Sequence, residues 1–156
     1  MGIRIISDTR AKRKQASALE LIAAFGPNGY FLEDALEYFK TQMLAVETNF
    51  NPVGIVTGNL RRSYATAGLY QRLPYVIRLT PNLSVAPYVP EVSERIRKRF
   101  GKSFVQLVIE RCGAEVDAAI AREMRRGLAV INSGGQYHYE NPFPGVPSAA
   151  GRGGAA

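Results

Sequence analysis

Residues 103–126 read SFVQLVIERCGAEVDAAIAREMRR, and this stretch decides the fold because it is the longest segment with a helical pattern. Apolar side chains recur every four residues along it and have further apolar neighbours, which predicts a long helix with a wide apolar stripe. The stripe consists of Phe104, Val108, Cys112, Val116, Ile120 and Met124, with Val105, Ile109 and Ala119 beside them. Arginines near the end of the segment complement the helix dipole, and Gly127 is the predicted stop.

Two shorter amphipathic helices are predicted upstream of this segment. The first runs from about Ala11 to Phe25 and the second from about Leu32 to Val46, with a break between them at residues 26–29, which read GPNG. Both show the spacing of a helix that buries one side. The apolar face of the first consists of Ala16, Leu19, Ile22 and Ala23, and that of the second of Leu32, Ala35, Leu36, Phe39 and Met43.

The middle of the chain predicts a short helix followed by a β-hairpin. Residues 57–64, TGNLRRSY, suit a short helix because Thr57 or Asn59 can accept the backbone N–H groups at its start. Residues 65–70 and 75–80 are rich in strand formers, and the linker QRLP at residues 71–74 suits a hairpin. Pro87 and Pro90 favour extended chain around residues 86–89. Residues 91–100 are expected as an exposed loop or a frayed helix.

These elements predict an α+β fold in which a small antiparallel hairpin packs against two or three helices. We expect one domain over residues 1–131, with residues 1–10 as a candidate N-terminal arm. Residues 136–140, QYHYE, are a candidate strand, whereas residues 141–156 are rich in Pro, Gly and Ala and cannot form a core of their own. Residues 132–156 are therefore expected as an extended C-terminal arm that docks on a neighbouring subunit or another partner. Its expected contact residues are Tyr137, His138, Tyr139 and Phe143.

The chain is strongly basic, with 20 Lys and Arg against 13 Asp and Glu and a formal net charge of +7. This charge suits either an acidic partner, such as packaged DNA, or simple solubility. The cations gather in three groups: Arg10, Lys12, Arg13 and Lys14; Arg95, Arg97, Lys98, Arg99 and Lys102; and Arg122, Arg125 and Arg126. Few aromatic side chains lie among them, so contact with nucleic acid is expected to be to phosphates and not to bases.

Little in the sequence resembles a catalytic or metal site. His138 is the single histidine, and Cys112, the single cysteine, lies on the apolar stripe and is interpreted as a small core residue. One cysteine makes no intrachain disulfide, and the glycine-rich stretches do not fit a phosphate-binding loop. No apolar run reaches the roughly 20 residues of a membrane helix. We expect a non-enzymatic protein without cofactor or metal, with a small enzyme of unrecognised type as a remaining alternative.

The segment Thr57-Gly58-Asn59-Leu60-Arg61-Arg62-Ser63, together with Ala86-Pro87-Tyr88-Val89, resembles the small neck proteins of tailed bacteriophages, the tail-completion or tail-terminator group of head–tail joining proteins. The family pattern T-G-x-L-R-x-S, with the tyrosine of the second segment, falls on Thr57, Gly58, Leu60, Arg61, Ser63 and Tyr88. The family's order of helix, motif, hairpin and long helix matches residues 30–126. The chain departs from the family after Tyr88, where it has PEVSE at residues 90–94 in place of a Glu-x-Gly-Thr stretch.

The resemblance implies a structural virion protein that forms a ring of identical subunits, commonly six, at the junction of head and tail. Such a ring terminates or completes the tail, contacts the connector and tail-tube proteins, and leaves a channel through which DNA passes. Its subunits are assembled in the host cytoplasm and reside in the virion neck. On this interpretation Arg61, Arg62, Arg95, Arg97, Lys98 and Arg99 are candidates for a subunit interface or for the lumen. The alternative is a basic module that binds nucleic acid without sequence specificity.

Overall fold

The computed structural model describes residues 9–49 and 59–146, and within these ranges it leaves aside the side chains of residues 45–49 and 61. The elements in chain order are α1 (Thr9–Phe25), α2 (Tyr30–Asn49), α3 (Asn59–Ala65), β1 (Leu69–Leu73), β2 (Val76–Thr80), α4 (Val89–Phe100) and α5 (Phe104–Asn132). Helices dominate and the two strands form one antiparallel sheet, so the predicted α+β class is confirmed.

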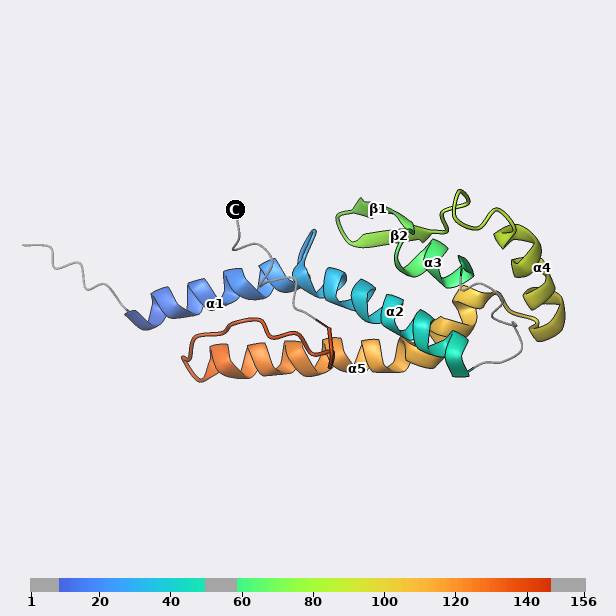
Figure 1. Cartoon of the computed structure of the whole chain (residues 1–156). Coiled ribbons are helices and arrows are strands. Elements are labelled where there is room, and N and C mark those ends of the chain that lie inside the picture. The colour runs from blue at the N-terminus through green and yellow to red at the C-terminus, as the bar shows by residue number, and fades with distance from the viewer. Residues whose placement is uncertain (1–8, 50–58, 147–156) are drawn as a thin grey trace, which may run out of the picture.

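Helix α5 is the longest of these helices, and α1 and α2 both pack against it. Figure 1 shows α1 and α2 lying end to end along it, with α1 beside its C-terminal half and α2 beside its N-terminal half. A capping box starts α5: Ser103 Oγ accepts the backbone N–H of Gln106 at 3.2 Å, and Gln106 Oε1 accepts that of Ser103 at 2.8 Å. These two bonds satisfy backbone donors that a helix start leaves without partners.

The predicted end of this helix at Gly127 is wrong, because α5 continues to Asn132. Gly127 is buried inside the helix, and its role is to allow a close approach. A Cβ placed there would lie 2.8 Å from Leu21 Cδ1 and 3.0 Å from Tyr137 Cε2. The glycine therefore marks a packing contact and not a helix stop.

The predicted buried face of α1 is also wrong. Leu19 and Ile22 are exposed by 59% and 60%, whereas Ser17 and Ala24 are buried. The helix turns its polar Ser17 inwards because the serine hydroxyl binds the backbone of the C-terminal segment: it accepts the N–H of Tyr137 at 2.9 Å. A specific hydrogen bond between distant segments thus overrides the local apolar pattern.

The hairpin is confirmed, with Leu69 opposite Thr80 and Leu73 opposite Val76. Its first strand starts four residues later than predicted because residues 65–68 complete the end of α3. The backbone N–H groups of Thr66 and Ala67 both donate to Arg62 O, at 3.3 and 2.8 Å. One face of the hairpin lies over α2, where Arg72 forms an ion pair with Glu33.

Of the two alternatives predicted for residues 91–100, the helix is confirmed and the loop is wrong, because α4 spans Val89–Phe100. The extended chain predicted for residues 86–89 is wrong at its end, where α4 begins. Tyr88 has helical backbone angles (φ −83°, ψ 0°), and Pro90 lies in the first turn. Proline is tolerated there because the first N–H groups of a helix have no partner within it. Gly101 ends the helix in the left-handed conformation (φ 70°), and its N–H donates to Arg97 O.

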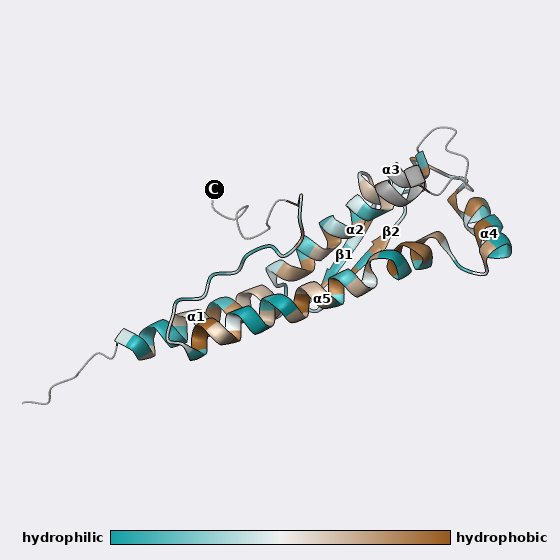
Figure 2. Ribbon diagram, turned by 90° about the horizontal axis from the view of Figure 1, so that it is seen from below, coloured by the Kyte–Doolittle hydropathy of each residue, from teal (hydrophilic) through white to brown (hydrophobic). Residues whose placement is uncertain are grey.

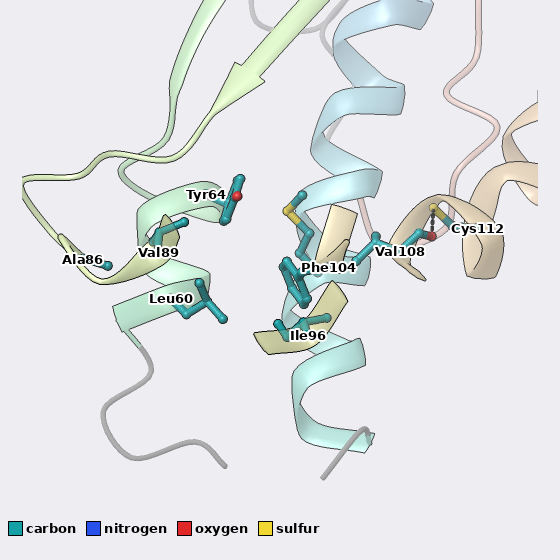
Figure 3. Packing of buried hydrophobic residues seen from close by; sticks show 9 residues of the cluster. Leu60, Tyr64, Ala86, Val89, Ile96, Phe104, Val108 and Cys112 are labelled. Atoms are coloured by element: carbon teal, nitrogen blue, oxygen red, sulfur yellow. Dashed lines mark hydrogen bonds between the residues drawn. The ribbon is translucent and has the colours of Figure 1, made fainter. Parts of the chain in front are cut away.

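The buried side chains form two clusters. The first joins α2, α3, α4 and the start of α5 and includes Met43, Leu60, Tyr64, Ala86, Val89, Ile96, Phe104, Val108 and Cys112 (Figure 3). The second lies where α1, α2, α5 and the C-terminal segment meet, and comprises Ala24, Phe31, Ala119, Tyr137, Tyr139 and Phe143. Figure 2 shows that the helices carry their hydrophobic residues in patches between hydrophilic stretches, as amphipathic helices do.

The described part of the predicted C-terminal arm, residues 133–146, runs back along α5 between that helix and α1 (Figure 1). Residues 136–140 form no strand, contrary to the prediction. Their backbone instead bonds to side chains of α1 and α5, so the segment is held as a strap on its own chain.

Candidate functional site

Part of the family-motif segment, residues 57–63, is buried in the core of its own chain. Leu60 and Ser63 of α3 are buried, and Ser63 Oγ donates to Leu60 O at 2.5 Å. The backbone N–H of Asn82 donates to Ser63 O at 2.8 Å, which ties α3 to the chain after the hairpin. Arg62 is exposed, and its nearest described partner is Asn59 Oδ1 at 3.4 Å. The motif thus combines a buried anchoring side with a charged side that is open to solvent.

Four other motif residues remain, three in this segment and one at the start of α4. Thr57, Gly58 and the side chain of Arg61 lie outside the described residues. Tyr88 is half-exposed at the start of α4, where its carbonyl accepts the N–H of Val92 at 3.1 Å. Tyr88 therefore helps to begin the helix that carries the second basic group.

Helix α4 presents the second basic group to solvent. The helix buries Val89 and Ile96, and this fixes its orientation. Arg95, Arg97, Lys98 and Arg99 all remain exposed on its other sides. Glu94 lies 3.8 Å from Arg97 and 3.9 Å from Lys98, so one carboxylate lies beside these four cations. The end of α4 is thus a cationic surface.

The three basic groups of the sequence lie apart in space. Arg10, Lys12, Arg13 and Lys14 occupy the exposed start of α1, at the end of the molecule opposite α4 (Figure 1). In the third group, Arg122 pairs with Glu115 at 3.1 Å, while Arg126 turns inwards to Glu123. Among the described residues, the fold therefore makes two cationic ends and no single basic patch.

A buried polar network holds the C-terminal strap. Glu123 is 5% exposed and receives Arg126 through two nitrogens, at 2.6 and 2.9 Å. It also accepts the hydroxyl of Tyr137 at 3.0 Å and the backbone N–H of Glu140 at 3.2 Å. On α2, the fully buried Asp34 accepts the hydroxyl of Tyr139 at 2.7 Å. Two buried carboxylates therefore act as acceptors for the strap.

The pKa shifts agree with a structural role for these groups. Burial alone would raise the pKa of Glu123, but hydrogen bonds from Arg126, Glu140 and Tyr137 outweigh it, and the pKa lies below its usual range. Burial and the adjacent carboxylates raise the pKa of both Tyr137 and Tyr139 well above that of free tyrosine. The carboxylate of Glu123 thus stays ionised and the tyrosines stay protonated at neutral pH.

The prediction that the arm residues contact a neighbouring subunit needs correction. Tyr137, Tyr139 and Phe143 are buried within their own chain, and Phe143 stacks on Tyr38 with ring centroids 4.7 Å apart. His138 alone of the four is exposed. These three aromatic side chains fill the space where α1, α2 and α5 meet. Residues 147–156 of the predicted arm lie outside the described residues.

An apolar groove, which the sequence did not predict, lies between α2, α5 and β2. Its volume is about 490 Å³. Its walls come from the predicted stripe of α2, from Ile77 and Leu79 of β2, and from Val105, Ile109 and Val116 of α5. Asp117 is the one charged residue in the lining. The signal in the sequence was Gly113, a residue without a side chain in the middle of an apolar helical stripe.

The remaining chemistry of the described residues is sparse. Cys112 is buried, its thiol donates to Val108 O at 3.1 Å, and burial raises the pKa of the thiol, which fits the predicted core role. No group of three or more metal-ligating side chains occurs within residues 9–49 and 59–146. Over the same ranges, no helix has the length and apolar character that crossing a membrane requires.

The sequence matches no protein-family model, no curated protein and no solved structure.

Proposed function

We propose that this chain is a structural virion protein of a tailed bacteriophage, a ring subunit at the head–tail junction that completes the tail and joins it to the head connector. The observation that carries the proposal is the segment TGNLRRS, residues 57–63, in its place between a long helix and a β-hairpin. The burial of Leu60 and Ser63 explains why such a motif requires a leucine and a small hydroxyl residue at these positions.

The surface of the described residues supports a protein that works by contacting other chains. A closed ring needs two different surfaces that fit each other on neighbouring copies. The groove between α2, α5 and β2 is one candidate surface. Large apolar side chains also lie exposed elsewhere, among them Leu19 and Ile22 on α1 and Leu69 and Val76 on the hairpin. Clustered apolar side chains at a surface commonly mark interaction sites.

The cationic end of α4 supports a place near passing DNA. Arg95, Arg97, Lys98 and Arg99 are exposed together, and Glu94 lies beside two of them. Side chains of this kind contact phosphates without reading bases, which suits a channel that must let any sequence through. On this proposal the partners are other copies of the chain, the connector, the tail-tube protein and the genomic DNA.

The experiment is a measurement of assembly by the purified chain. We expect light scattering to give a mass that is a fixed multiple of the subunit mass, and negative-stain microscopy to show rings with an open centre. The resemblance implies six subunits. A chain that stays monomeric at all concentrations, both alone and with the connector and tail-tube proteins, would overturn the proposal.

The exposed cations of α4 also favour a second candidate, a module that binds nucleic acid without sequence specificity. This candidate predicts a monomer whose affinity for duplex DNA falls steeply with salt. Replacing both Arg97 and Lys98 by Glu should then abolish binding, while the same change at Arg122 and Arg125 serves as a charge-matched control. Tight DNA binding by a monomer would select this candidate over the ring subunit.

A further inference from the structure

The floor of the groove contains a glycine that the packing of the chain itself does not explain. A Cβ placed on Gly113 would meet only Ile109 Cγ2, at 3.8 Å, which is ordinary van der Waals contact. Glycine within a helix costs about 1 kcal/mol relative to alanine. The chain accepts this cost at a position where its own neighbours leave room for a side chain. A segment that approaches the helix closely at this point would account for the glycine.

The groove has a definite chemical character. Eleven of its twelve lining residues are apolar or glycine, and Asp117 is the single exception. No cation of the described residues forms an ion pair with Asp117. A fitting occupant therefore has several large apolar side chains and one cation. It also needs to be narrow, because the groove lies between two helices and a strand.

We propose that the groove binds the N-terminal segment, residues 1–8, of a second copy of this chain; this inference rests on the proposed ring. The segment reads MGIRIISD, and within it Ile3, Ile5 and Ile6 surround Arg4. The isoleucines fit the apolar walls, and Arg4 fits Asp117. The other terminal segment, residues 147–156, reads PSAAGRGGAA and has no large apolar side chain to fill the groove.

The length of the chain places this contact between two copies. Helix α1 has 17 residues, which span about 25 Å. From the start of α2 to Leu32, the first groove residue of α2, is about 3 Å more, because α1 and α2 lie end to end (Figure 1). Ile3 is six residues before Thr9, so even fully extended chain carries it only about 20 Å from the start of α1. The segment cannot reach its own groove and can reach that of a neighbour.

The hairpin offers such a segment a further contact. In the described residues the sheet has two strands, so the second edge of β2 has no strand partner. Side chains of β2 line the groove, whereas none of β1 does. A segment that adds to a sheet edge gains backbone hydrogen bonds and places alternate side chains on one face.

Cross-linking of the full chain tests the contact. One chain carries Ile5→Cys and a mass tag, and the other carries Ile109→Cys in the groove. Cys112 stays in both because it is buried. We expect a mixed disulfide dimer on oxidation. Ala118→Cys is the matched control, since Ala118 is exposed half a turn around α5 from Ile109.

Two outcomes would overturn the inference. One is an equal yield of mixed dimer with Ala118→Cys, or none with Ile109→Cys. The other concerns the double variant Ile5→Cys/Ile109→Cys at high dilution: a cross-link within single chains, with none between chains in the mixture, would show that the segment binds its own groove.

A pair of substitutions at Gly113 gives an independent test. Gly113→Ala adds one methyl group at the point of close approach and should raise the concentration needed for assembly about threefold, whereas Gly113→Leu fills the groove and should raise it at least tenfold. Equal assembly of both variants would refute the docking of residues 1–8 and leave the proposed ring standing. A wild-type chain that gives the specific cross-link but never a ring would refute the proposed function and leave the docking standing.

Discussion

The two halves of α5 differ in what covers them. In the C-terminal half, Gly127 lies against Leu21 of α1 and Tyr137 of the strap, with no room for a Cβ. In the N-terminal half, Gly113 faces an open groove and has room for one. Both are glycines in one helix, yet the first is explained by the fold of the chain and the second is not. The comparison separates the half that the chain covers itself from the half that is available to a partner.

The largest effect is expected when the buried network of the covered half loses its acceptor. Glu123→Ala removes at once the acceptor of the Tyr137 hydroxyl and of the Glu140 backbone N–H, and one of the partners of Arg126. We expect the free energy of unfolding to fall by about 3 kcal/mol, because a partly buried ion pair is broken and the Tyr137 hydroxyl and the Glu140 backbone N–H are left without this acceptor. Urea denaturation measures this. Glu115→Ala, which breaks only the exposed pair with Arg122, is the control and should change stability by less than about 0.5 kcal/mol.

The two glycines provide the next test. Gly127→Leu forces a side chain against Leu21 and Tyr137 and should lower the free energy of unfolding by about 2 kcal/mol. Gly113→Leu should leave the monomer as stable as the wild type or raise its stability by up to about 1 kcal/mol, since helix propensity improves. Thermal or urea unfolding under conditions that keep the chain monomeric compares them. Equal destabilisation by both would erase the distinction between the halves.

A smaller loss is expected at the second point where the strap is held. Tyr139→Phe deletes the hydroxyl that donates to Asp34 at 2.7 Å but keeps the buried ring. The expected cost is about 1–2 kcal/mol, the range for a buried carboxylate that loses one hydrogen bond. Tyr75→Phe makes the same change on a side chain that is 66% exposed and should be neutral. Comparison of the two urea midpoints decides the matter.

The smallest effect is the pH dependence of the covered half. The pKa of Glu123 is lower in the folded chain than in the unfolded chain, so its ionised form stabilises the fold. That stabilisation is fully present above the unfolded value of about 4.3 and is lost as the pH falls through the folded pKa. The difference in stability between the wild type and Glu123→Gln should therefore shrink from neutral to strongly acidic pH. A difference that stays constant would exclude this linkage.

Local patterns in the sequence sufficed for the helices and the hairpin. The apolar stripe of α5, the break at residues 26–29 and the β-rich segments each depend on neighbours within a few positions. Helix α4 was predicted only as one of two alternatives, a loop or a frayed helix, and its start was missed because Pro87 and Pro90 suggested extended chain, although Pro90 is compatible with a first turn.

Features that depend on distant segments were predicted poorly. The buried side of α1 follows from Ser17, whose partner Tyr137 is 120 residues away. The same holds for Gly127, which only the approach of Leu21 and Tyr137 explains. The groove was missed because periodicity shows that the stripe of α2 is apolar but not what covers it. The motif residues Leu60 and Ser63, by contrast, were singled out from sequence alone.

The strap also determines when the chain can finish folding. Tyr139 bonds to Asp34 across 105 residues, and Tyr137 bonds to Ser17 across 120. Contacts at such separation form late, because most of the chain must be present before they close. During synthesis α1 and α2 therefore emerge long before the residues that complete their core, and a product truncated before Tyr137 lacks part of that core. The second buried cluster is complete only on chains that have been translated past the strap. Any surface that depends on this cluster therefore forms only on such chains.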